Sequence, residues 1–227
     1  MTDLVLLNTY KYYRGLPHQK AAIAAFEAEI KAKLPGALEL LADGWRKSPD
    51  ELLTIDDLTA ITTAKRDRLL EFLPHLNEGF RRYEVNTPLR IAHFLAQILH
   101  ESGELSLVRE LWGPTEAQQG YEGRADLGNT EAGDGFRFRG RGLIQITGRS
   151  NYREVGTHFK IDCLKWPEKL EQLPYSVLTA FWFWQKKKLN DWADKDDVEA
   201  ITRLINGGYN GLSDRRKYLA RAKEVLL

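Results

Sequence analysis

Nine glycines between Gly113 and Gly148 divide the middle of this chain into pieces too short for ordinary helices. The segments on both sides have the apolar spacing that is typical of amphipathic helices. A long irregular segment inside a domain is usually functional or disordered. Its tryptophan, tyrosines and phenylalanines favour a packed segment, because disordered chains contain few aromatic residues. We therefore expect a mainly α protein with a loop-rich centre and at most a small β element.

The helix that begins at Thr87 is the best-defined element. Thr87 can cap it, and Pro88 suits the first helical position because its missing N–H needs no partner there. Gly103 is expected to end the helix. The apolar residues follow at i, i+3, i+4, i+7 and i+8, which predicts one buried face: Ile91, Phe94, Leu95, Ile98 and Leu99.

Other segments with helical spacing cover most of the remaining chain. Pro74 is expected to interrupt one of them, and a short strand is expected within 141–147. Trp182 and Trp184 are two positions apart, so they cannot share a helix face, and at least one is expected in the core. The predicted helices cover residues 19–34, 37–45, 56–72, 75–83, 175–187, 198–205 and 214–227.

Composition excludes several classes of protein. The formal net charge of +1 argues against a general nucleic-acid binder. The single cysteine, Cys163, excludes an internal disulfide, and no stretch approaches the roughly 20 apolar residues of a membrane span. The N-terminus lacks the basic start and longer apolar core of a signal peptide. We expect a protein made in the cytoplasm, which would need a separate route of release if it acts outside.

Two glutamates have the spacing of a possible catalytic pair. Glu101 lies in the last turn of the Thr87 helix, where the helix dipole and partial burial disfavour its ionisation, as a general acid requires. Taken alone, it is more simply a surface glutamate. Glu110 lies nine positions later, beyond Gly103, so a turn of the chain can bring it back across a cleft. Two carboxylates across a cleft are the machinery of glycoside hydrolysis.

Several motifs resemble glycoside hydrolase family 19, which includes plant-type chitinases and many phage endolysins. Residues 94–103, with His100-Glu101-Ser102-Gly103, resemble the catalytic helix of the family, and Glu110 occupies the place of its second acid. Residues 134–152 resemble the central signature. Later blocks match at 180–184 and 205–208, and Arg215 fits the arginine of the last helix. The resemblance runs from about Leu53 to the end, which divides the chain into an N-terminal helical extension, 1–50, and a catalytic domain, 51–227.

This resemblance implies a lysozyme-like two-lobed helical fold and an inverting mechanism. Glu101 would protonate the glycosidic oxygen, and Glu110 would activate a water on the far face of the sugar. Arg215 would pair with a catalytic carboxylate, and no metal or cofactor would be needed. The remaining matched residues would bind water or sugar: Thr147, Gln145, Asn151, Tyr152 and Asn206. Trp112, Tyr121 and Tyr152, which we expect in loops, are candidates for stacking on sugar rings.

Departures from the family leave alternatives open. A hydroxyl residue that often follows the base is absent at Trp112, and Thr115 is its candidate replacement. Glu122 is a second candidate base. A zinc-peptidase interpretation of His100-Glu101 fails, because that motif needs a second histidine at position 104, which is Glu104. His100 is expected to pack or to support a neighbour rather than act as a base. Cys163 is expected to be a buried thiol rather than a nucleophile.

The substrate class follows from the resemblance and the composition together. The family acts on β-1,4-linked polymers of N-acetylated sugars. Without disulfides and with a local basic patch, the chain is expected to be a peptidoglycan-cleaving endolysin that acts as a muramidase. It is expected to act as a monomer on the cell wall, after release by a separate, holin-like route. The alternatives are a chitinase and a non-catalytic cell-wall-binding protein. The patch consists of Arg137, Arg139, Arg141, Arg149 and Arg153. These arginines are either solvated loop charges or a site that attracts an anionic substrate.

Overall fold

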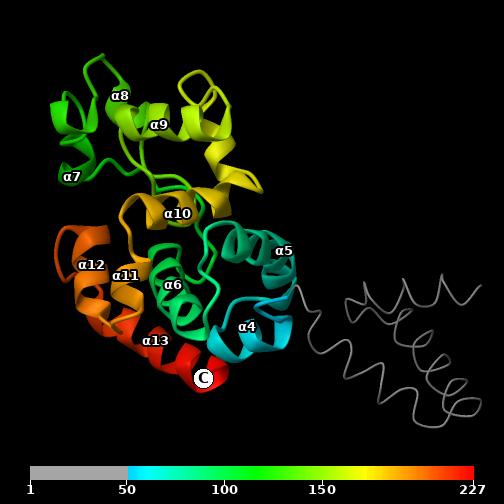
Figure 1. Cartoon of the computed structure of the whole chain (residues 1–227). Helices are drawn as coiled ribbons and strands as arrows, with labels where there is room; N and C mark the ends of the chain where they lie inside the picture. The colour runs from blue at the N-terminus through cyan, green and yellow to red at the C-terminus, as the bar shows by residue number, and fades with distance from the viewer. Residues whose placement is uncertain (1–50) are drawn as a thin grey trace, which may run out of the picture. The chain divides into compact units, whose positions relative to one another are not determined.

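Helix α6 (Pro88–Glu101) lies at the centre of the computed structural model, which describes residues 51–227 (Figure 1). Its start is as predicted, because Thr87 Oγ1 accepts a hydrogen bond from Arg90 N at 3.3 Å. The expectation of a single buried face is wrong, since every residue from Ile91 to Leu99 is buried. Helix α13 (Leu212–Leu226) packs along α6, and α11 (Asn190–Ala193) also contacts it. Neighbours on several sides therefore enclose the whole helix.

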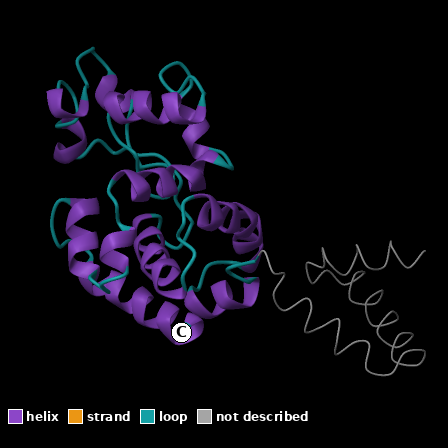
Figure 2. Ribbon diagram, in the orientation of Figure 1, coloured by secondary structure: helices purple, strands orange, loops and turns teal. Residues whose placement is uncertain are grey.

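The helices of the described residues form two groups, shown in Figures 1 and 2. The first lobe, residues 52–105 and 187–227, contains α6, α11 and α13 together with α4 (Ile55–Ile61), α5 (Arg66–Arg82) and α12 (Val198–Asn206). The second lobe is residues 106–174. It contains α7 (Glu116–Gln119), η1 (Ala125–Leu127), α8 (Asp134–Arg137), α9 (Arg149–Phe159) and η2 (Pro167–Glu171). Helix α10 (Tyr175–Lys186) lies between them and contacts both α5 and η2.

An aromatic cluster joins α5, α6 and α10. The ring of Phe94 stacks on that of Phe181, with centroids 4.1 Å apart, and Phe80 meets Phe181 edge-on at 5.2 Å. Gly79 makes this packing possible, because a Cβ there would lie 2.1 Å from the Phe181 ring. Burial of large aromatic rings stabilises a core strongly, so this cluster fixes the helix on which Glu101 lies.

Two predictions about the first lobe are wrong. The single helix expected at 56–72 is two helices, because Thr54 caps α4 and the chain leaves helical geometry after Ile61. Pro74 does not interrupt α5, which is continuous from Arg66 to Arg82. Buried residues before and after the proline, including Phe72 and Leu76, hold the helix against the core. Their burial offsets the hydrogen bond that the proline removes.

The second lobe is as irregular as predicted up to Gly148. Its helices before that point have three or four residues, and residues 51–227 contain no strand. The expected strand at 141–147 is wrong, since Arg141 forms only isolated bridges with Arg109 and Ile146. Helix α9 was not predicted. The mainly α, two-lobed fold class is confirmed.

The C-terminal predictions are confirmed. Helices α10, α12 and α13 lie at the predicted segments, and Trp182 and Trp184 are both buried. Cys163 is buried as expected, and burial raises its pKa to about 11. In the part of the chain that is described, no helix is both long and apolar enough to cross a membrane. The helices expected at 19–34 and 37–45, and the proposed extension 1–50, lie outside the described residues.

Candidate active site

Glu101 is the last residue of α6, and its side chain is 18% exposed. Its Oε1 accepts a hydrogen bond from the guanidinium of Arg215, which lies on α13 and is 1% exposed. The expected pairing of Arg215 with a carboxylate is therefore present. Two helices far apart in sequence thus fix the direction of this carboxyl group.

Gln97 belongs to the same cluster and was missed from the sequence. It lies one turn before Glu101 on α6, and its Oε1 accepts a hydrogen bond of 2.6 Å from Arg215 Nη1. Arg215 therefore bridges two residues four positions apart, which share a helix face. The available signal was a glutamine at i−4 from Glu101 within an otherwise apolar stretch.

Glu110 is held by the second lobe. Its Oε2 accepts a hydrogen bond from Gly140 N at 3.1 Å, and its Oε1 accepts one from Gln118 Nε2 at 3.0 Å. The hydroxyl of Tyr121 donates to the same Oε1 at 3.4 Å. Burial, together with the nearby Glu110 charge, raises the pKa of Tyr121, so the phenol remains a donor. Gln118 is a second residue that the sequence did not reveal. Its Oε1 also accepts hydrogen bonds from the backbone N–H groups of Gly113 and Thr115.

The two carboxylates share none of these partners. Arg215 and Gln97, around Glu101, lie on α13 and α6 of the first lobe. The groups that hold Glu110 all lie in the second lobe. Each lobe therefore fixes one carboxylate, and the chain between them turns at Gly103, where φ is +53°.

Three of the predicted sugar- or water-binding residues form one local structure beside Glu110. Gln145 has a positive φ of +55°, and Thr147 Oγ1 donates to its carbonyl at 3.0 Å. Asn151 Nδ2 in turn donates to the Thr147 carbonyl at 2.8 Å. A Cβ on Gly140 would lie 2.6 Å from Gln145 Oε1 and 3.4 Å from Glu110 Cβ. Glycine at 140 thus lets Gln145 approach Glu110, and the strained backbone at Gln145 is a common feature of functional sites.

The prediction for Tyr152 is wrong. It lies on α9 rather than in a loop, and its ring is 0% exposed. Its hydroxyl donates to the Arg139 carbonyl at 2.6 Å and accepts from Arg141 Nη1 at 2.8 Å. Burial raises its pKa. A residue of this kind supports the second lobe and presents no face to a sugar.

The other aromatic candidates are only partly buried. The ring of Trp112 lies 6.4 Å from Tyr121 and 5.1 Å from Phe136, which is 51% exposed. The hydrogen bond from the Tyr121 hydroxyl connects this group of rings to Glu110. It therefore offers apolar ring faces close to one carboxylate.

The remaining candidates have local partners. Glu122 accepts hydrogen bonds from Gly133 N and Gly135 N, at 2.6 and 2.8 Å, so its carboxylate fastens the loop before α8. The Thr115 hydroxyl caps α7. Asn206, at the end of α12, is exposed, and its amide lies 3.5 Å from the Asn210 carbonyl. His100 Nδ1 lies 2.7 Å from Asp214 Oδ2, which fits the supporting role expected for it.

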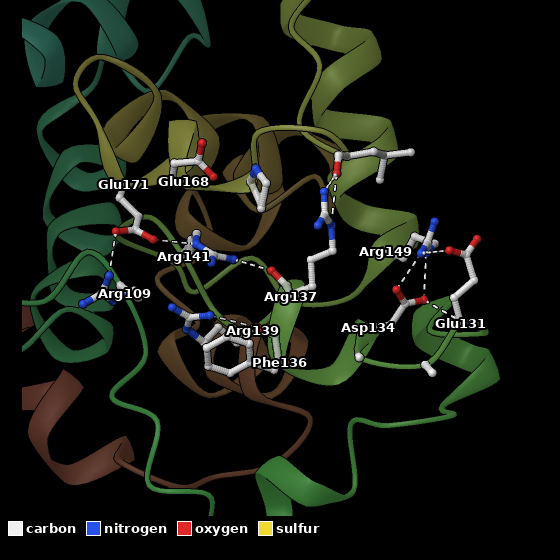
Figure 3. Close-up of a pocket in the computed structure, with 14 residues that line it drawn as sticks. Arg109, Glu131, Asp134, Phe136, Arg137, Arg139, Arg141, Arg149, Glu168 and Glu171 are labelled. Carbon is white, nitrogen blue, oxygen red and sulfur yellow. Dashed lines mark hydrogen bonds and ion pairs between the residues drawn. The ribbon is translucent and has the colours of Figure 1, made fainter.

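Four of the five predicted basic-patch arginines line a pocket of about 730 Å³ in the second lobe (Figure 3). Arg109 completes the set, and Arg153 lies outside it. Most of these charges have partners. Arg141 pairs with Glu171 at 2.6 Å, and Arg149 pairs with Asp134 at 2.6 Å. The simple description of solvated loop charges therefore does not fit this patch.

Comparison with known proteins finds similarity to one group of enzymes. A protein of Haemophilus influenzae described as a glycosyl hydrolase family 19 domain-containing protein is 43% identical over 98 residues, which is 43% of this chain and 46% of the relative. The chain is a homologue of the family 19 glycoside hydrolases. Rice chitinase 5 is 33% identical over 115 residues, or 48% of this chain and 38% of the relative. No family model matches the chain.

Solved structures with the same fold are chitinases. Chitinase C from Streptomyces griseus aligns with a TM-score of 0.62 and 19% identity, covering 78% of this chain and 93% of that one. A class IV chitinase of family 19 from Zea mays aligns with a TM-score of 0.55 and 19% identity, over 77% and 90% of the two chains. This chain thus has the fold of these chitinases. It spans under half the length of the curated relatives it matches.

Proposed function

We propose that this family 19 homologue is an inverting glycoside hydrolase that cleaves β-1,4 bonds between N-acetylated sugars. Glu101 is the general acid, which donates its proton to the glycosidic oxygen. Glu110 is the base, which takes a proton from the attacking water on the opposite face of the sugar. Inverting enzymes hold the two carboxyl groups about 6.5–9.5 Å apart to leave room for that water.

One observation carries this proposal. Each carboxylate is fixed by its own lobe, Glu101 by Arg215 and Glu110 by Gly140 and Gln118. A substrate chain between the lobes would therefore meet an acid on one side and a base on the other. Gln145 approaches Glu110 across Gly140, and hydrogen bonds link it to Thr147 and Thr147 to Asn151. We propose that the water and the adjacent sugar bind to this group of residues.

Within this activity we favour peptidoglycan, so that the protein would be an endolysin of the muramidase type. The bond cleaved would join N-acetylmuramic acid to N-acetylglucosamine. The arginine-lined pocket of the second lobe supports this choice, because peptidoglycan carries carboxylates and chitin does not. We further propose that the protein reaches the cell wall after release by a separate route and acts there as a monomer.

Chitin is the second candidate substrate, and the names of the relatives favour it, since most of them are chitinases. Both polymers share the β-1,4 linkage of N-acetylated sugars, so the two carboxylates would act in the same way. A non-catalytic wall-binding protein is the third candidate. Its expected feature, loss of one of the two carboxylates, is absent here.

The test is mass spectrometry of the products from purified Gram-negative sacculi, with chitohexaose in parallel. New N-acetylmuramic acid reducing ends are the expected result. Cleavage of chitohexaose alone would assign a chitinase, and no product from either substrate with folded protein would favour the binding protein. Proton NMR of the first products checks the stereochemistry, since an inverting enzyme releases the α-anomer from a β-linked chain.

A further inference from the structure

The pocket of the second lobe contains one buried arginine with no acidic partner, Arg139. Arg137 also lacks an acidic partner, but it is exposed and donates to the backbone carbonyls of Leu164 and Lys165. Arg139 is 9% exposed, and its Nε has no hydrogen-bond partner. Its Nη1 donates to the Phe136 carbonyl at 2.9 Å, and the guanidinium lies over the Phe136 ring, 4.2 Å from the centroid (Figure 3). Removing a cation from water without a counter-charge is costly, and a cation–π contact offsets only part of that cost.

The other cations of the pocket already have partners. Glu171 accepts hydrogen bonds from both Arg109 and Arg141, at 3.3 and 2.6 Å. Arg149 is paired with Asp134 and Glu131 at the opposite end. Burial, together with the positive charges of Arg141 and Arg109, lowers the pKa of Arg139. Arg139 is therefore the member of this pocket at which an added anion would find an unsatisfied donor and the least competition.

The pocket lies beside the proposed base but on the other side of the chain. Arg109 is bridged to Arg141 in extended geometry, so the side chains of Arg109 and Glu110 point in opposite directions. Gly140, which donates to Glu110, lies between Arg139 and Arg141. Phe136 joins the two regions, since its ring meets both Arg139 and Trp112. The pocket thus suits a substituent of a glycan rather than the sugar ring at the cleavage point.

We propose that this pocket is an anion-binding subsite, in which Arg139 receives a carboxylate of a peptide that branches from the glycan near Glu110. This inference rests on the proposed function and names a specificity residue for it. Two nitrogens of the guanidinium, Nη2 and the solvent-shielded Nε, have no protein hydrogen bond, so a carboxylate bound at Nη2 would supply the counter-charge that the group lacks. A glycan chain without peptides would bind without this contact.

The test uses calorimetry to measure the affinities of two soluble ligands for the full chain carrying Glu101→Gln. One ligand is the disaccharide of N-acetylglucosamine and N-acetylmuramic acid with a tripeptide, and the other is the same disaccharide without the peptide. The peptide-bearing ligand is expected to bind roughly 10- to 100-fold more tightly, the effect of a hydrogen bond to a charged group. Adding Arg139→Gln should bring the two affinities within about threefold, and Arg139→Lys should restore part of the difference.

Arg153→Gln is the matched control, because it removes the same charge outside the pocket. It should keep the preference for the peptide-bearing ligand. Equal affinities for both ligands before Arg139 is changed, or an unchanged preference after Arg139→Gln, would overturn the subsite. The affinities of both variants are measured at a temperature equally far below the melting temperature of each. If Arg139→Gln does not fold, Arg139→Lys replaces it in the test. The expected result is then a weaker preference for the peptide-bearing ligand than the chain with Arg139 shows.

The subsite and the proposed function fail in different ways. Wild-type protein that releases no muropeptides from sacculi would count against the proposed function, whatever the ligand preference. Wild-type protein that does release them, together with equal affinity for the two ligands, would overturn the subsite alone. Inorganic phosphate is tested as a competitor of the peptide-bearing ligand. Phosphate that binds the pocket as tightly as that ligand would contradict the assignment to a peptide carboxylate.

Discussion

Arg215 on α13 donates one guanidinium nitrogen to Glu101 and another to Gln97, which lie one turn apart on α6. The arginine is buried, so this arrangement sets the position of the carboxyl group and also ties the last helix to the central one. A charged residue at the end of a helix usually rotates in solvent. Here both ends of the contact are fixed.

Arg215→Lys should therefore lower activity without removing the charge. A lysine reaches one of the two acceptors, so Glu101 or Gln97 loses its partner. We expect kcat to fall about tenfold or more, the effect of one charge-assisted hydrogen bond, with KM little changed. Arg216→Lys is the control, since Arg216 is exposed and pairs with Glu199 instead. An equal fall in both variants would contradict the positioning role.

The identity of the base is tested by two glutamine substitutions. Glu110→Gln should lower kcat by about 10²–10⁴-fold, which is the usual contribution of a general base. Glu122→Gln should lower stability more than activity, because the Glu122 carboxylate accepts the backbone N–H groups of Gly133 and Gly135. Hydrolysis of sacculi and chitohexaose, with urea unfolding of each variant, separates the two effects. A larger loss of kcat in Glu122→Gln would make Glu122 the base.

Gly79→Ala tests the packing that holds α6. In an exposed helix, alanine stabilises relative to glycine by about 1 kcal/mol. At Gly79 the added methyl would lie 2.1 Å from the Phe181 ring, which is itself buried. We expect a loss of about 1–3 kcal/mol in the free energy of unfolding, as for other overpacked cores. Gly113→Ala is the comparison, since nothing lies within 4 Å of a Cβ there.

The sequence predicted the helices whose apolar residues repeat regularly, and it predicted the two carboxylates through the motifs around them. It failed where tertiary packing decides. Pro74 would end an isolated helix, yet the buried residues around it keep α5 continuous. Tyr152 lies in a matched motif, but its position inside the second lobe depends on contacts with Arg139 and Arg141. Gln97, Gln118 and the isolation of Arg139 likewise depend on pairings between distant segments, which one sequence does not reveal.

Stability should fall as the pH falls below about 6.5, and His93 should contribute to that loss. His93 on α6 is 0% exposed, and its Nε2 lies 2.8 Å from Asp196 Oδ1. Burial lowers its pKa, and the Asp196 contact opposes this only in part. Above about pH 6.5 the histidine is neutral in both states, so it adds no pH dependence. Below that value the unfolded chain takes up a proton that the folded chain resists, and the native state is destabilised.

The expected slope from this one group is at most about 1.4 kcal/mol per pH unit, between the unfolded and folded pKa values. Urea unfolding at pH 8.0, 6.5 and 5.5 measures it, and His93→Gln should flatten the dependence between the two lower values. His158→Gln is the comparison, because burial also lowers the pKa of His158 although its side chain is exposed. Its removal should change the slope less. Parallel curves for wild type and His93→Gln would mean that other groups set the acid limit of this fold.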